Sequence, residues 1–134
     1  MFEALKNLVQ IHEKAMQQLQ AEGEAALREV FKDFFAEFPM VTAIRWTQYT
    51  PYFNDGEACV FSVHEPSLRT DADFLEPYDR EFDSLPAPLI EAHAELTSLL
   101  QSDAIERVLL AMFGDHNQVT VYPKQIVVDG YSHD

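Results

Sequence analysis

The chain has 134 residues, with 23 acids and 9 bases, so its formal net charge is −14 at pH 7. This length suits one domain, residues 1–134, and 47% hydrophobic residues exclude wholesale disorder. So acidic a surface repels nucleic acids and anionic membranes, and it favours a basic protein surface as the partner. The single cysteine, Cys59, excludes a disulfide framework and a zinc site built on cysteines.

The sequence shows no signal for membrane insertion or secretion. No apolar run reaches the roughly 18 residues that a membrane helix needs. The first residues, Met1–Lys6, include Glu3 and lead into no long apolar core. We therefore expect a cytoplasmic protein that does not bind membranes.

The first forty residues predict two helices separated by Gly23. Apolar residues in the first helix follow steps of three and four, which is an a/d seam. The seam consists of Phe2, Leu5, Val9, His12, Met16 and Leu19. It is too short for a free-standing coiled coil, so it should pack on the domain or on a second copy, which predicts a homodimer through this helix. The second helix, 24–38, is rich in phenylalanine and is interpreted as core, and Pro39 ends it.

A change to period two then predicts two strands, 41–50 and 58–64. The linker Pro51–Glu57 contains an Asn-Asp-Gly turn sequence, so the strands should form a β-hairpin. Cys59 falls on the apolar face of the second strand and is expected to be buried and inert. The side chains expected to face the helices are Ile44, Trp46, Phe61 and Val63.

Residues 65–86 have the highest density of acids in the chain, with seven acids and two bases. Several prolines exclude one continuous helix or central strand here. Aromatic and leucine side chains alternate with the acids and could anchor the segment. We interpret it as an ordered acidic excursion within the single domain.

In the remaining residues, apolar side chains follow helical spacing over two stretches. Apolar and polar residues then alternate, as in strands. The expected elements are helices 89–100 and 103–113 and strands 119–122 and 126–129. Asp103 and Glu106 have the spacing of a capping box, and Gly114 stands where a helix ends. Each half therefore predicts helix, helix, strand, strand. The predicted fold class is α+β, with a four-stranded antiparallel sheet of two hairpins and helices packed on one face.

No motif identifies a reaction. The chain lacks a nucleophile elbow, a phosphate loop, a dinucleotide fingerprint and a His-Glu-x-x-His sequence. We therefore predict no catalytic residue, no cofactor and no metal. Asp115-His116, and His133-Asp134 with Asp129, offer ligand atoms for a divalent ion. A small metal- or carboxylate-dependent enzyme stays open as an alternative, as does a structural or assembly protein.

Two parts of the sequence resemble a known group of proteins. The run Trp46-Thr-Gln-Tyr-Thr-Pro-Tyr-Phe-Asn-Asp-Gly-Glu57 with Cys59–Val63, and the closing Tyr131-Ser-His-Asp134, are similar to uncharacterised small phage and bacterial proteins. The resemblance covers about a third of the chain and brings no activity or catalytic residue with it. It implies a phage or mobile-element origin. Small acidic phage proteins resemble inhibitors of host enzymes, some of which present acids as DNA presents phosphates.

These observations predict a non-enzymatic acidic binding protein, an inhibitor or DNA mimic that occupies a basic, nucleic-acid-binding surface of a host protein. The predicted partner-binding residues are Tyr52, Phe53, Asp55 and Glu57 in the hairpin loop, and Asp71, Asp73, Phe74, Glu76, Tyr78, Asp79, Glu81, Phe82 and Asp83 in the acidic excursion. The alternative interpretation is that the rings fold back on the core and the acids are merely solvated.

Overall fold

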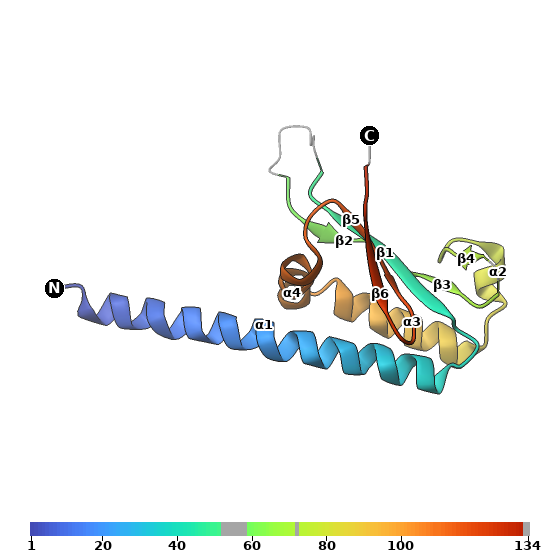
Figure 1. The fold of residues 1–134 in the computed structure, drawn as a ribbon, viewed down its shortest axis with the longest axis horizontal. Coiled ribbons are helices and arrows are strands. Elements are labelled where there is room, and N and C mark those ends of the chain that lie inside the picture. Colours follow the sequence, from blue (N-terminus) through green and yellow to red (C-terminus); the bar gives the residue numbers. More distant parts are fainter. Residues whose placement is uncertain (52–58, 72, 133–134) are drawn as a thin grey trace.

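The structure is a computed structural model, and it describes residues 1–51, 59–71 and 73–132. Its helices are α1 (Glu3–Glu37), α2 (Arg80–Asp83), α3 (Ala87–Leu100) and α4 (Asp103–Phe113). Its strands are β1 (Ala43–Tyr49), β2 (Ser62–Val63), β3 (Ser67–Arg69), β4 (Phe74–Leu75), β5 (Asn117–Val121) and β6 (Ile126–Gly130). Figure 1 shows α1 running beneath the sheet and extending well past it at the N-terminal end.

The strands form one antiparallel sheet in the order β4-β3-β1-β5-β6, and β2 also pairs with β1. The two predicted hairpins, β1 with β2 and β5 with β6, are confirmed. The α+β class is also confirmed, but the described part of the sheet has six strands where we expected four. The two additional strands, β3 and β4, and the short helix α2 all lie inside the acidic excursion.

Strands β2 and β3 run along the same edge of β1 and are separated by a β-bulge. Gln48 pairs with Val63 and Arg45 pairs with Ser67, so three steps along β1 match four steps on the other side. One extra residue is therefore accommodated between Val63 and Ser67. Pro66 lies in this interval. Proline has no backbone N–H, and at a bulge none is needed for pairing between the strands.

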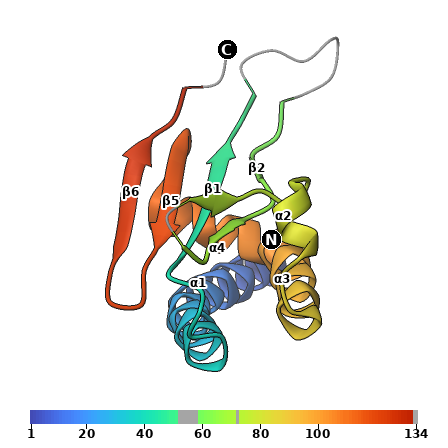
Figure 2. The ribbon, with the colours of Figure 1, turned by 90° about the vertical axis from the view of Figure 1, so that its right-hand side faces the viewer.

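Helices α1, α3 and α4 lie on one side of the sheet (Figure 2), and the core fills the space between them. Alternation along β1 buries Ile44 and Trp46 there, as predicted. The Trp46 ring stacks on Phe31 of α1 at 5.7 Å between centroids and meets the edge of Phe113 at 6.2 Å. Val63 is also buried, and Phe61 packs against the core as a half-buried ring.

A buried glutamine joins the central strand to the end of α4. Trp46 Nε1 donates to Gln48 Oε1 at 3.0 Å. Gln48 Nε2 donates to the carbonyl oxygens of Leu109 at 3.0 Å and Gly114 at 2.7 Å. Gly114 ends α4, as predicted, with a φ of 81° that favours glycine. The fully buried amide is therefore satisfied by an indole N–H and by two carbonyls, one near the C-terminal end of α4 and one at Gly114, the residue that follows the helix.

The predicted break at Gly23 is wrong, because α1 is one helix of 35 residues. Gly23 is buried against α4, and a Cβ added there would lie 3.1 Å from Val108 Cγ2. The missing side chain lets the two helices approach closely. Glycine in a helix costs about 0.5–1 kcal/mol relative to alanine, which helix packing of this extent outweighs.

The predicted capping box of α4 is also wrong. Ser102, and not Asp103, occupies the N-cap position. Glu106 Oε2 instead accepts a hydrogen bond from the Val63 backbone N–H at 2.7 Å, and Gln101 Nε2 donates to the Val63 carbonyl at 3.1 Å. A side chain of α4 and one of the connection between α3 and α4 thus bond to Val63 where a further strand beside β2 could pair.

The predicted strand 58–64 is too long, because within the described residues 59–64 only Ser62–Val63 forms a strand. Cys59 lies outside it and is half-buried, so our prediction of a buried thiol on the apolar face of a strand is wrong. Among the described residues, no helix is long and apolar enough to cross a membrane.

Candidate partner-binding surfaces

The predicted binding segment lies at the edge of the sheet. We call residues 71 and 73–83, which include β4 and α2, the acidic rim. Figure 1 places β4 and α2 at the end of the molecule opposite to the N-terminus of α1. The rim carries six acids and one base, Arg80. Its side chains fall into two groups, one held by the domain and one exposed.

Phe82 belongs to the group that the domain holds. It is only 4% exposed, and its ring meets the edge of His93 at 4.7 Å between centroids. His93 Nε2 lies 2.7 Å from the Pro66 carbonyl oxygen, and because a carbonyl can only accept, the ring N–H donates this hydrogen bond. Phe82 thus anchors α2 to α3, and we leave it out of the binding set.

Phe74 and Glu76 are likewise engaged within the chain. The Arg45 guanidinium lies 3.9 Å from the centre of the Phe74 ring, a cation–π contact, and that of Arg69 lies 5.6 Å away. Arg45 also forms an ion pair with Glu76 at 3.6 Å. These contacts attach the rim to β1 and β3 and reduce its exposed negative charge.

Tyr78 is held out into solvent by a tight turn. The Asp79 backbone N–H donates to the Glu76 carbonyl at 2.9 Å, and Asp79 Oδ2 accepts from the Glu76 N–H at 2.8 Å. The turn places Pro77 and Tyr78 at its tip, and the tyrosine side chain is 85% exposed. It borders a cleft of about 500 Å³ that His64 and Glu65 also line. Among the three predicted rings of the rim, Tyr78 is therefore the one available to a partner.

Four further acids of the rim are exposed. They are Asp71, Asp73, Glu81 and Asp83. The predicted loop residues Tyr52, Phe53, Asp55 and Glu57 lie outside the described residues, so their position relative to the rim stays a prediction.

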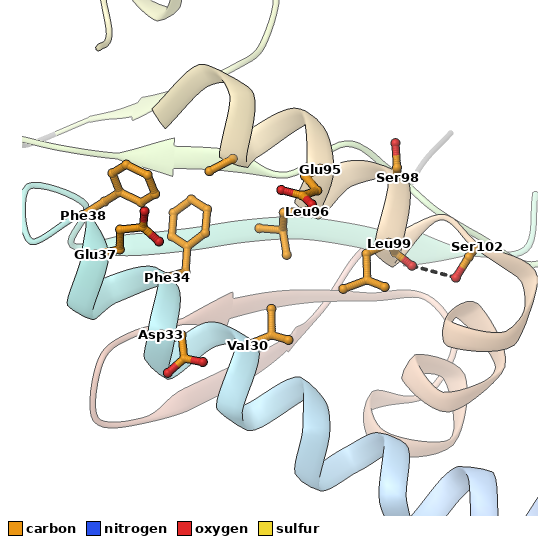
Figure 3. A pocket seen from close by; sticks show the side chains of 11 residues that line it. Val30, Asp33, Phe34, Glu37, Phe38, Glu95, Leu96, Ser98, Leu99 and Ser102 are labelled. Atoms are coloured by element: carbon orange, nitrogen blue, oxygen red, sulfur yellow. Dashed lines mark hydrogen bonds between the residues drawn. The ribbon is translucent and has the colours of Figure 1, made fainter. Parts of the chain in front are cut away.

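A second surface, which we did not predict, is the groove between α1 and α3 (Figure 3). It measures about 600 Å³. Val30 and Phe34 of α1 face Leu96 and Leu99 of α3 across it. The carboxylates that line it are Asp33, Glu37 and Glu95. Apolar side chains and acids thus meet at one place, which we call the α1/α3 groove.

The pair Asp115-His116, which offered ligand atoms in the sequence, has a structural role. The Asp115 carboxylate accepts from the Thr50 N–H at 2.8 Å, from Thr50 Oγ1 at 2.7 Å and from the His116 N–H at 2.8 Å. Burial pushes the pKa of Asp115 upward, but these hydrogen bonds and the charge of His116, at 3.7 Å, outweigh it and lower the pKa. The carboxylate therefore ties the end of β1 to the connection between α4 and β5.

An aromatic cluster lies beside this connection. The Tyr49 ring stacks on His64 at 4.5 Å and lies 5.4 Å from Tyr131. Burial, and then the charge of the Tyr131 phenolate, raise the pKa of the Tyr49 hydroxyl. Within residues 1–51, 59–71 and 73–132, no three His, Cys, Asp or Glu side chains are grouped so as to hold a metal ion. The terminal pair His133-Asp134, which also offered ligand atoms, lies outside these residues.

Compared with protein-family models, with curated proteins and with solved structures, the chain matches none. A function for this chain must therefore be argued from its own residues and geometry.

Proposed function

We propose that the protein is a non-enzymatic acidic binding protein and that it takes a basic amphipathic helix of a partner into the α1/α3 groove. The observation that carries this proposal is the meeting of an apolar floor with a carboxylate border. Stable interfaces need a desolvated apolar centre, and a helix laid in a groove supplies one through residues at i, i+3, i+4 and i+7. The acids around the floor select lysine or arginine on the flanks of that helix.

The acidic rim has a second role in this proposal. Exposed acids at this end of the sheet attract a basic partner, and Tyr78 offers an aromatic contact at the edge of the bound surface. Charge of this kind acts on the association rate more than on affinity, and salt screens it over about 8–10 Å. A basic, nucleic-acid-binding protein of a host is the partner class that fits both surfaces, and binding would inhibit it by covering its basic site.

A pair of peptides tests the proposal directly. The probe is a synthetic helical peptide with leucine on one face and lysine on the other, and the control peptide replaces every lysine by glutamate. We expect the lysine peptide to bind, with affinity that falls as salt rises, and the glutamate peptide not to bind. Fluorescence anisotropy measures both. Equal binding of the two peptides would contradict an acidic binding site.

Matched variants locate the binding site. Leu99→Lys places a positive charge in the groove, whereas Leu110→Lys makes the same change at a comparably exposed leucine of α4 (39% and 37% exposed). We expect Leu99→Lys to weaken binding of the lysine peptide about tenfold or more and Leu110→Lys to leave it within about twofold. Equal affinities for the two variants would exclude the groove.

A second matched set tests the carboxylates. The groove variant carries Asp33→Asn, Glu37→Gln and Glu95→Gln, and its control carries Glu29→Gln, Glu91→Gln and Asp129→Asn. All six acids are exposed, and both variants lose three negative charges. Only the groove variant should lose affinity beyond the effect of net charge. An equal loss of affinity in both variants would show that only net charge attracts the peptide, and it would contradict a specific site in the groove.

A further inference from the structure

The N-terminal half of α1 projects from the domain with its apolar residues uncovered. We call residues 2–19 the N-terminal arm, and Figure 1 shows it extending past α4. Phe2, Leu5 and Val9, the first three residues of the seam, are 60%, 63% and 48% exposed. An isolated helix of this length is only marginally stable in water, and a continuous exposed apolar face marks an interaction site.

The distribution of charge identifies the kind of partner. Residues 1–20 contain two acids and two bases, whereas the other 114 residues contain 21 acids and 7 bases and hold the whole net charge of −14. Two domains of this protein therefore repel each other, but two arms do not. The polar side of the arm has no excess of lysine, so an anionic lipid surface is a poor fit.

We propose that the arm binds the arm of a second copy in an antiparallel pair. In this orientation a positions face d positions of the partner. The seam then aligns completely, in the layers Phe2 with the partner's Leu19, Leu5 with the partner's Met16, and Val9 with the partner's His12. The antiparallel orientation also places the two acidic domains at opposite ends of the paired arms, where their repulsion is smallest.

The charged residues beside the seam favour the same orientation. Lys6 and Glu13 both occupy e positions of the heptad. In an antiparallel pair, e positions face e positions, so Lys6 meets the partner's Glu13 twice in the symmetric dimer. In a parallel pair, e faces g, and the g positions are Met1, Leu8 and Ala15, which offer no opposite charge. Charge complementarity therefore exists only for the antiparallel arrangement.

The base of the arm offers a place for the end of the partner's helix. A cleft of about 130 Å³ is lined by Met16 and Leu19 of the arm and by Arg107 and Val108 of α4. The antiparallel register brings the partner's Phe2 to Leu19, beside this cleft. The dimer interface thus continues from the arms onto α4 of each copy.

The oligomeric state is the first test. Sedimentation equilibrium of the full chain over about 1–500 µM should show a monomer–dimer equilibrium. Leu5→Ser with Val9→Ser should abolish it, and the control Val60→Ser with Val128→Ser, which changes two exposed apolar residues outside α1 and α4, should not. A monomer at every concentration, a trimer or larger assembly, or equal effects of the two variants would overturn the proposal. So would a monomeric chain that binds phosphatidylserine vesicles through the arm.

Charge exchange is the second test. Lys6→Glu and Glu13→Lys should each weaken the homodimer, because like charges then meet across the pair. Mixing the two single variants should restore a dimer at least as strong as wild type, and the chain that carries both substitutions should pair with itself. No effect of either single substitution would contradict the antiparallel orientation.

Cross-linking gives the orientation independently. In a Cys59→Ser background, the Leu5→Cys chain and the Met16→Cys chain should form a mixed disulfide after mild oxidation. The Leu5→Cys chain alone should not, because two copies of residue 5 lie about 16 Å apart along the antiparallel pair, which is beyond disulfide reach. A disulfide between two Leu5→Cys chains would show a parallel pair and overturn the proposal. These tests use no groove residue, so the dimer and the proposed function can fail separately.

Discussion

The two halves of α1 have similar apolar patterns but opposite surroundings. In the C-terminal half, Leu27, Phe31 and Phe34 are buried against the sheet and the other helices. In the N-terminal half, Leu5 and Leu8 lie in solvent. Helical periodicity therefore shows which side of a helix is to be covered, but not whether the same chain covers it.

Truncation of one side chain in each half should show the largest difference. Phe31→Ala removes the ring that stacks on Trp46 and should lower the free energy of unfolding by about 3–5 kcal/mol. Ile11→Ala, at an exposed position outside the seam, should change it by less than about 0.5 kcal/mol. Urea unfolding followed by Trp46 fluorescence measures both. Similar losses would mean that the arm is packed on the domain.

Gly23 marks the point where the covered half begins, and a side chain there should have an intermediate effect. Gly23→Leu would force α4 away at Val108 and should cost about 1–3 kcal/mol, despite the better helix propensity of leucine. The control Ala25→Leu, at an exposed position, should be close to neutral. Thermal unfolding compares the two variants. A stabilised Gly23→Leu protein would contradict the close approach of the helices.

The smallest effect should come from a site outside α1 that depends on pH. Because the pKa of Asp115 is lower in the folded chain, its carboxylate stabilises the fold above the pKa that it has in the unfolded chain, and this contribution is lost as the pH falls through the folded pKa. Asp115→Asn should therefore be less stable than wild type near neutral pH, and the difference should shrink below a pH of about 4. Urea unfolding at several pH values checks this. A difference independent of pH would assign the effect to the loss of hydrogen-bond acceptors alone.

The sequence predicted those features of the fold that depend on residues close together in the chain. Period-two alternation identified Trp46 as a core residue, and the end of α4 was recognised from Gly114. Gly23 was misread, because the propensity of glycine is weak against the packing of α1 on α4. The bulge at Pro66 was missed, because its signal is the register between β1 and two separate short strands.

The candidate site was less predictable than the fold. Acid density singled out residues 65–86, and Tyr78 is exposed there, but a binding role for the rim stays a prediction. Nothing local distinguishes Tyr78 from Phe82, whose burial depends on His93 of α3. The α1/α3 groove combines residues that are more than fifty positions apart in sequence, so only the three-dimensional arrangement reveals it.

The side chains that bond to Val63 have a consequence for how copies of this chain meet. An uncovered strand edge is a template on which a strand of another molecule can add, and this is the route to edge-to-edge aggregation. Glu106 and Gln101 occupy the Val63 N–H and carbonyl, so no foreign strand finds a free pair of groups at this residue. Growth of the sheet by strand addition is therefore blocked at Val63.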